Sequence, residues 1–305
     1  MAEGKIWIDG SLVKWDEARI HVLTHGLHYG TGVFEGIRSY KTKDGQAVFR
    51  LPDHIQRLID SGKIYFMELG YSKEQLQKAV IDTIRANEIE ECYIRPIAYY
   101  GYGKMGVNPL PNKVSVAISV WKWDEYLKGK NTRRGARLMI SAWTRIDSRS
   151  MPIHAKATAN YANSALARVE ALKAGFDEAI MLNANGFVVE ASAENIFVVK
   201  NNTLITPSVS SGALNGITRN SIITLAKEHN IPCEIRDISR DELYIADELF
   251  LTGTAAQVKS VAEIDNRLIG DGKAGMITKQ LKTFFEAVVH GRDQKFSRIW
   301  LTPIN

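Results

Sequence analysis

The central part of the chain shows a helical spacing of apolar residues followed by two short apolar runs. Between residues 159 and 174 apolar side chains recur at three- and four-residue steps, which predicts a helix. The residues that this spacing places on one face are Tyr161, Ala165, Leu166, Val169 and Leu172. Gly175 follows, at the position where a left-handed cap would end the helix.

A hairpin is predicted directly after this helix. The apolar run 179–182 and the return run 187–189 flank Asn185-Gly186, and both residue types of that turn tolerate positive φ. The second strand ends at Glu190. The unit therefore places Lys156 ahead of a helix, Tyr161 on its first turn and a carboxylate at a strand end.

Other local signals predict most of the remaining elements. Hairpins are expected around Asp9-Gly10 and Asn201-Asn202, and capping boxes at Ser72/Gln75 and Ser239/Glu242 are expected to start helices. Further strands are predicted near 47–49, 92–99, 114–120 and 248–252, and further helices over 52–67, 216–229 and 275–289. The helix over 52–67 is expected to bury Ile55, Leu58, Ile59 and Ile64. Pro96 predicts that the strand 92–99 lies at a sheet edge or is interrupted.

Length and composition predict a globular protein of two domains. The 305 residues are 45% hydrophobic and 24% charged, and no run of eighteen apolar residues predicts a membrane span. The formal net charge of +5 is too small to predict nucleic-acid binding. Cys92 and Cys233 form no CxxC motif, and the N-terminus lacks a secretory signal, so we expect a cytoplasmic location. The polar, basic segment 128–136 is the predicted linker between a small α/β domain, 1–127, and a large α/β domain, 137–305.

Two patterns near the N-terminus predict neither a nucleotide site nor a metal site. Gly30, Gly32 and Gly36 are not spaced as GxGxxG. The histidines at 21, 25 and 28 are interrupted by glycines that disfavour a helix, so no metal is expected.

Lys156 is the candidate nucleophile or base of the central unit. A single lysine is most often a solvated surface residue. Residues 151–155, Met-Pro-Ile-His-Ala, are poor in charge, and a lysine in such surroundings can be desolvated, which lowers its pKa.

Four stretches of the sequence resemble the signature of the class IV aminotransferases, which are pyridoxal-phosphate enzymes of fold type IV. These are Lys156 followed by Asn160-Tyr161, then EASAENIF at 190–197, LNGITR at 214–219 and LTGTAA at 251–256. Tyr93-x-Arg95-Pro96 together with Gly106-Val107-Asn108-Pro109 resembles the branched-chain amino-acid branch of that family. The resemblance implies an α/β fold (α+β type) with two domains and the cofactor at their interface.

The resemblance also implies the roles of individual residues toward pyridoxal phosphate. Lys156 would carry the cofactor and transfer the proton, Glu190 would pair with the pyridine nitrogen, and Tyr161 would bind the phenolate oxygen. The phosphate would be held by Arg57, Ile217, Thr218 and Thr254. Leu214, Gly216 and Gly253 complete the cofactor-binding set. Gly216 precedes a predicted helix, and a helix N-terminus favours an anion.

The implied substrates are leucine, isoleucine and valine, with 2-oxoglutarate or glutamate as the partner, in the biosynthesis or degradation of these amino acids. The residues expected to bind them are Tyr29, Phe34, Gly36, Tyr93, Arg95, Val107, Trp123, Tyr126, Thr254 and Ala255. Arg95 is expected to receive the side-chain carboxylate of glutamate. The Val107 loop would reach a neighbouring subunit, which implies a homodimer or a higher oligomer.

Three other functions are compatible with the sequence. A D-amino-acid or (R)-amine transaminase and an aminodeoxychorismate lyase use the same fold and cofactor. A ligand-binding protein without catalysis is disfavoured because Lys156, Tyr161 and Glu190 are all present. The absorbance of a bound cofactor would separate the enzymes from the binding protein.

Overall fold

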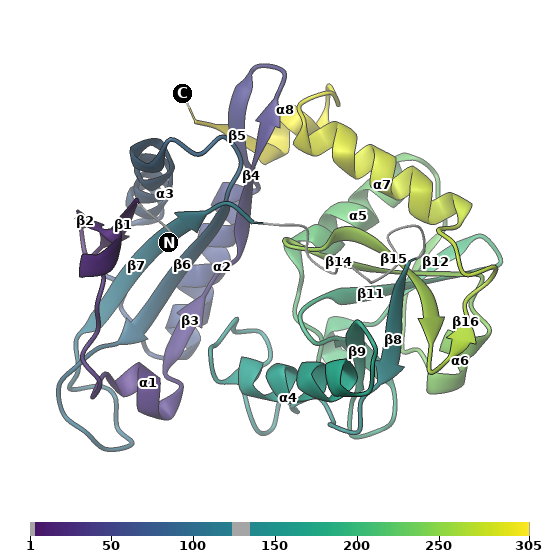
Figure 1. Ribbon diagram of the computed structural model, residues 1–305, viewed down its shortest axis with the longest axis horizontal. Coiled ribbons are helices and arrows are strands. Elements are labelled where there is room, and N and C mark those ends of the chain that lie inside the picture. Colours follow the sequence, from purple (N-terminus) through teal and green to yellow (C-terminus); the bar gives the residue numbers. More distant parts are fainter. Residues whose placement is uncertain (1–3, 124–134, 305) are drawn as a thin grey trace. The chain divides into compact units, whose positions relative to one another are not determined.

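The computed structural model describes residues 4–123 and 135–304, and these form two units (Figure 1). The first unit comprises Met1–Asp124, His154–Ala159 and Val288–Asn305, and the second comprises Glu125–Ile153 and Asn160–Ala287. The predicted linker, 128–136, falls almost wholly on residues outside the described ranges and stays a prediction. The C-terminal residues from Val288 onward, which the sequence alone assigns to the large domain 137–305, belong to the first unit. There the strand β17 (Leu301–Pro303) pairs with β5 (Gly45–Phe49).

The first unit contains an eight-stranded sheet in the order β17-β5-β4-β6-β7-β1-β2, with β3 paired to β6. All of its described strand pairs are antiparallel. The strands are β1 (Lys5–Ile8), β2 (Ser11–Lys14), β3 (Gly32–Phe34), β4 (Ile37–Thr42), β5 (Gly45–Phe49), β6 (Tyr93–Tyr100), β7 (Val114–Trp121) and β17 (Leu301–Pro303). The helices are η1 (Trp15–Glu17), α1 (His25–Tyr29), α2 (Leu51–Ile64), α3 (Lys73–Asn87) and α8 (Phe296–Trp300).

Helices α2 and α3 lie against this sheet (Figure 1). Their buried apolar side chains form the first core together with those of the strands. Ile55 and Leu58 of α2 are fully buried, as predicted, but Ile64 is 41% exposed because it closes the helix where the chain turns away. The predicted capping box of α3 is confirmed, since Ser72 accepts from the Gln75 amide and Gln75 accepts from the Ser72 amide.

Pro96 lies in the middle of the sheet, where the ladder beside it is interrupted. One side of β6 pairs with β4 through Tyr93 and Ile94 and with β3 from Ile97 onward. Pro96 falls in the gap between these two ladders, so its missing N–H leaves no partner unpaired. Of the two predicted alternatives, an edge or an interruption, the interruption is confirmed.

The second unit contains a nine-stranded sheet in the order β10-β9-β8-β15-β14-β11-β12-β13, with β16 paired to β15. The pairs β8–β9, β8–β15 and β12–β13 are parallel, and the other described pairs are antiparallel. The strands are β8 (Ala136–Ile140), β9 (Glu178–Leu182), β10 (Val188–Ala191), β11 (Asn195–Lys200), β12 (Thr203–Thr206), β13 (Cys233–Ile235), β14 (Glu248–Gly253), β15 (Gln257–Ile264) and β16 (Arg267–Leu268). The helices are α4 (Asn160–Lys173), η2 (Val209–Ser211), α5 (Ile217–Glu228), α6 (Arg240–Tyr244) and α7 (Met276–Val289), of which α7 continues into the first unit at Val288.

Helix α4 occupies the predicted range, but its apolar face is not its buried face. Ala167 and Ala171 are fully buried against Ala179 and Met181 of β9. By contrast, the large side chains Leu166, Val169 and Leu172 are 49–53% exposed. Small residues let the helix approach the strand closely, and this contact decides which face is buried.

No helix in the described part of the chain is long and apolar enough to cross a membrane. The longest, α3, has 15 residues, and a membrane-spanning helix needs about 20.

Candidate active site

Lys156 lies on a short segment of the first unit that is held through its backbone. Its amide donates to the Ser61 hydroxyl (3.0 Å) and its carbonyl accepts from the Phe34 amide (2.9 Å). The next residue, Ala157, is buried and bridges to Val33 of β3. The Lys156 ammonium group lies 5.0 Å from the centre of the Phe34 ring. The lysine is half-buried beside an aromatic ring, as the low charge of its flanking sequence predicts.

Phe34 also contacts Arg95, and these two residues begin a second group that the sequence predicts for substrate binding. The Arg95 guanidinium lies 4.7 Å from the Phe34 ring centre and 5.3 Å from that of Tyr93, and its Nη2 donates to the Tyr93 hydroxyl (3.2 Å). The Trp123 ring lies 4.3 Å from the Tyr93 ring. Within the described part of the chain, the buried Nε of Arg95 has no hydrogen-bond partner. The group therefore keeps a buried donor that a carboxylate could use.

Gly36 is required in this group for steric reasons. A Cβ atom at this position would lie 2.1 Å from the Tyr93 hydroxyl oxygen, well inside van der Waals contact. The glycine therefore makes room for that hydroxyl.

The other residues predicted for substrate binding in the first half of the chain lie elsewhere. Tyr29 is exposed and its ring contacts the His25 and His28 rings. Val107 is 83% exposed on the loop after β6. Tyr126 lies outside the described residues.

Arg57, predicted to bind the cofactor phosphate, is held by a carboxylate that sequence reasoning missed. Its Nε and Nη2 donate to Glu35 Oε1 (2.6 Å) and Oε2 (2.9 Å), and His54 Nδ1 donates to Oε2 (2.7 Å). Glu35 and His54 are both buried. A signal was present in the sequence, because Glu35 interrupts the apolar run Val33–Ile37 and His54 precedes Arg57 by one helical turn.

The charges of this cluster follow from burial and from its contacts. Burial alone would raise the pKa of Glu35, but the Arg57 guanidinium and His54 outweigh burial and hold that pKa well below its usual value. Burial lowers the pKa of His54 despite the nearby carboxylate, and Arg57 and Lys156 add to the lowering. The cluster therefore consists of an ionised carboxylate, a guanidinium and a neutral imidazole.

In the second unit Glu190 is a buried carboxylate with partners on both of its oxygens. Oε1 lies 2.9 Å from Arg145 Nη2, and Oε2 accepts from Asn195 Nδ2 (3.1 Å) and the Leu214 amide (3.1 Å). Arg145, which sequence reasoning missed, is itself buried, and its Nη1 donates to Ser164 (3.0 Å). These contacts fix the orientation of the Glu190 carboxylate.

The predicted anion site at the start of α5 is built around a close approach to Asn195. Gly216 is the N-cap of α5, and a Cβ atom there would lie 1.9 Å from Asn195 Oδ1. Glycine is therefore required so that Asn195 can reach both Glu190 and the Leu214 carbonyl (2.9 Å). The next residues, Ile217 and Thr218, are buried in the first turn, where backbone N–H groups favour an anion.

The remaining predicted residues of the second unit are half-buried. Tyr161 is the second residue of α4. Gly253 ends β14, and Thr254 and Ala255 form the turn into β15. The structure therefore assembles the candidate residues in two groups: Lys156, Phe34, Arg95 and Arg57 lie in the first unit, and Glu190 and the start of α5 lie in the second.

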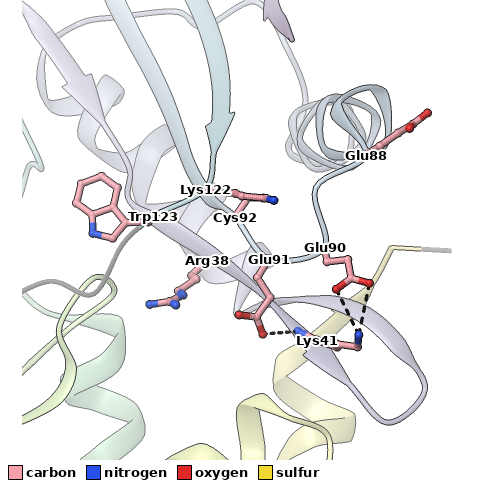
Figure 2. A pocket seen from close by; sticks show the side chains of 8 residues that line it. All are labelled: Arg38, Lys41, Glu88, Glu90, Glu91, Cys92, Lys122 and Trp123. Atoms are coloured by element: carbon pink, nitrogen blue, oxygen red, sulfur yellow. Dashed lines mark hydrogen bonds and ion pairs between the residues drawn. The ribbon is translucent and has the colours of Figure 1, made fainter. Parts of the chain in front are cut away.

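The first unit also contains a hollow of about 650 Å³. Figure 2 draws the side chains that line it. Its lining residues are Arg38, Lys41, Glu88, Glu90, Glu91, Cys92, Lys122 and Trp123. Lys41 pairs with Glu90 at an exposed position, and burial raises the pKa of the Cys92 thiol to about 11. Mixed charges and an unreactive thiol give this hollow no catalytic group, and Trp123 is the one predicted site residue that lines it.

Comparison with known proteins identifies the family of the chain. The family model described as amino-transferase class IV matches residues 32–264. The chain is 44% identical to the branched-chain-amino-acid aminotransferase of Pseudomonas aeruginosa, covering 99% of this chain and 98% of the relative.

Solved structures agree with the sequence matches. The branched-chain amino acid aminotransferase of Escherichia coli superposes with a TM-score of 0.96 at 41% identity, covering 100% of both chains. The T.th. branched-chain amino acid aminotransferase complexed with N-(5'-phosphopyridoxyl)-L-glutamate gives a TM-score of 0.94 at 43% identity, again covering 100% of both chains.

Proposed function

The chain belongs to the class IV aminotransferase family, and from this premise we propose that it is a branched-chain amino-acid aminotransferase that uses pyridoxal phosphate. It transfers the amino group of leucine, isoleucine or valine to 2-oxoglutarate and forms glutamate. Relatives with that printed activity are 41–45% identical over almost the whole chain. The structural observation that carries the proposal is Lys156, fixed through its backbone and half-buried against Phe34.

Each unit carries residues with the chemistry that a phosphorylated pyridine aldehyde requires. The cofactor supplies a ring that accepts the electron pair released when the substrate loses its α-proton. Lys156 carries the cofactor, and its Nζ moves the proton at the substrate Cα. Glu190, oriented by its ion pair with Arg145, would accept a hydrogen bond from the pyridine N–H.

Two further sets of residues would orient the cofactor. Tyr161 would donate its hydroxyl to the phenolate oxygen. Arg57, the first-turn amides of α5 at Ile217 and Thr218, and Thr254 hold the phosphate, a mixture of side-chain and main-chain donors that suits a dianion.

Phe34, Tyr93 and Arg95 let one pocket accept two kinds of substrate. The Phe34 ring provides an apolar wall for a leucine side chain. The Arg95 guanidinium rests against aromatic rings when that apolar side chain is bound, and it pairs with the carboxylate when glutamate is bound. The Tyr93 hydroxyl, for which Gly36 makes room, and the backbone amides of Thr254 and Ala255 bind the α-carboxylate.

A coupled assay with purified protein and added pyridoxal phosphate tests the proposed activity. Glutamate should form from 2-oxoglutarate with L-leucine, L-isoleucine and L-valine. Activity with D-alanine or (R)-phenylethylamine in place of these substrates would identify an (R)-selective transaminase. Release of pyruvate from aminodeoxychorismate would identify a lyase.

Arg95→Ala is expected to impair the reaction with glutamate far more than the reaction with leucine. In this partly buried pocket the glutamate carboxylate would lose its charge partner. The activation free energy calculated from kcat/KM for glutamate should therefore rise by about 2–4 kcal/mol. Single-turnover kinetics with each amino acid measure the two half-reactions separately. Arg85→Ala is the matched control, because Arg85 is an exposed arginine of α3 in the same unit and pairs with Asp82 outside the Arg95 group. Equal losses for leucine and glutamate would assign Arg95 a structural role.

We also propose that the protein forms a homodimer through the surface around α1 and the loop after β6. Exposed apolar side chains gather on these segments: Val22, Leu27, Tyr102, Val107 and Leu110. The two segments are joined, since His25 Nε2 lies 2.7 Å from the Gly106 carbonyl oxygen. Such an apolar surface favours burial against a second copy. Light scattering should give at least twice the chain mass of 34.1 kDa, and a monomer at micromolar concentration would contradict the proposal.

A cytoplasmic location completes the proposal. Cys92 and Cys233 are free thiols, which is typical of a reducing compartment. Cell fractionation that recovers the enzyme mainly outside the cytoplasm would exclude it.

A further inference from the structure

We infer that Glu35 is a positioning residue that fixes the Arg57 guanidinium in the orientation needed to bind the cofactor phosphate. The inference rests on the proposed function, because it takes Arg57 as a phosphate ligand. It adds a residue that makes no contact with the phosphate itself.

The interruption of the sheet places Glu35 beneath α2. β3 ends at Phe34 and β4 begins at Ile37, so Glu35 and Gly36 lie in the gap between the two ladders. The Glu35 amide still donates to the Pro96 carbonyl (2.8 Å), which anchors the backbone in the gap. The side chain is fully buried there, within reach of α2.

The Glu35 carboxylate has hydrogen-bond donors on both oxygens. Arg57 occupies one site on each oxygen in a bidentate arrangement (2.6 and 2.9 Å). His54 Nδ1 (2.7 Å) and the Gly36 amide (3.2 Å) add two further bonds to Oε2. Four bonds to a buried carboxylate leave it little freedom, so the carboxylate acts as a fixed template for the guanidinium fork.

This arrangement reduces the conformational freedom that Arg57 loses when phosphate arrives. An arginine side chain loses rotamer entropy when it is fixed. Because Glu35 already fixes Arg57 in the folded protein, Arg57 loses little further conformational entropy when phosphate binds. The carboxylate also acts in the opposite direction, since its negative charge repels the phosphate dianion. Positioning and charge therefore predict opposite effects on affinity when Glu35 is replaced.

Two substitutions separate these effects. Glu35→Asp keeps the charge but withdraws the carboxylate by one methylene group, so it removes the template alone. Glu35→Gln removes the charge and places an NH₂ group against a donor of Arg57 or His54. His54→Gln is the matched control, because it alters the same buried cluster and leaves the Glu35–Arg57 pair in place.

The experiment measures the dissociation constants of pyridoxal phosphate and of pyridoxal for the apoprotein by quenching of tryptophan fluorescence. Pyridoxal lacks the phosphate, so the ratio of the two constants isolates the phosphate contacts. Glu35→Asp should reduce the preference for pyridoxal phosphate by about tenfold or more. Glu35→Gln should also reduce it, but by less, because this variant removes the repulsive charge together with the template. His54→Gln should reduce it by no more than about twofold. Thermal unfolding of each variant checks that it is folded, and Glu35→Asp alone decides the matter if Glu35→Gln does not fold.

The outcomes distinguish this inference from the proposed function. If the wild-type protein prefers pyridoxal phosphate and Arg57→Lys removes that preference, Arg57 is the phosphate ligand. Unchanged or stronger preference in both Glu35 variants would then overturn the positioning role alone. If the wild-type protein binds both compounds equally, the assignment of the phosphate site to Arg57 fails first.

Discussion

Lys156→Ala is expected to abolish transamination and the visible absorbance of the holoenzyme, with the fold unchanged. The ammonium group is the proposed attachment point of the cofactor and the proposed base, so turnover should fall by several orders of magnitude. The fold should persist because the contacts that fix the segment are made by the backbone, to Ser61 and Phe34, and alanine keeps them. Steady-state kinetics, absorbance spectra and thermal unfolding measure the three parts of the prediction.

A control lysine makes this result specific. Lys63, an exposed residue of α2, belongs to the same unit, and Lys63→Ala should leave turnover within about twofold of wild type. If Lys156→Ala retained a tenth of the wild-type kcat, Lys156 would not be the catalytic lysine.

Glu190→Gln is expected to reduce both kcat and stability. A neutral amide cannot keep the pyridine nitrogen protonated, so kcat should fall by at least two orders of magnitude, as for a lost transition-state charge partner. The sequence alone predicts that Glu190 has a catalytic role and that Glu190→Gln leaves the fold intact. The structure alters that expectation, because Arg145 is buried against Glu190 (2.9 Å) and would lose its charge partner. Removing one partner of a buried ion pair lowers the free energy of unfolding by about 3–5 kcal/mol. The glutamine side-chain oxygen can still accept one hydrogen bond, so we expect a loss near the lower end of this range.

Glu194→Gln is the matched control for Glu190→Gln. Glu194 is also a buried glutamate, on the turn before β11, but burial and the neighbouring Glu178 raise its pKa well above the usual value. Glutamine resembles the protonated acid, so Glu194→Gln should leave both kcat and the unfolding temperature nearly unchanged. A near-normal kcat in Glu190→Gln, measured beside this control, would show that another group pairs with the pyridine nitrogen.

Elements with a strong local signal were predictable from the sequence. The turns at Asp9-Gly10, Asn185-Gly186 and Asn201-Asn202 and the capping box at Ser72 all occur where expected, because a few neighbouring residues determine each. The burial of α4 was not predictable in this way. Its buried face is set by contact with β9, and Ala167 and Ala171 carry no periodic signal stronger than that of the exposed leucines.

Pairing between strands that are far apart in the sequence could not be predicted from local patterns. β17 lies more than 250 residues from its partner β5, and nothing in its three residues indicates that strand. α8 was missed as well, because its five residues form little more than one turn.

The candidate site shows the same limit. Lys156, Tyr161, Glu190 and Arg57 were selected largely through family resemblance, and their partners Glu35 and Arg145 were not. Glu35 is 22 residues from Arg57, and Arg145 is 45 residues from Glu190. Only the folded chain brings these charges together, and each pair then determines how its predicted site residue is oriented.

The attachment point of the cofactor is the most direct test of the proposed function. Borohydride reduction of the holoenzyme, followed by proteolysis and mass spectrometry, identifies the lysine that carries the pyridoxyl group. The label should be on Lys156, in the segment between Ile153 and Asn160. A label on any other lysine, or no label on a protein that catalyses transamination, would contradict it.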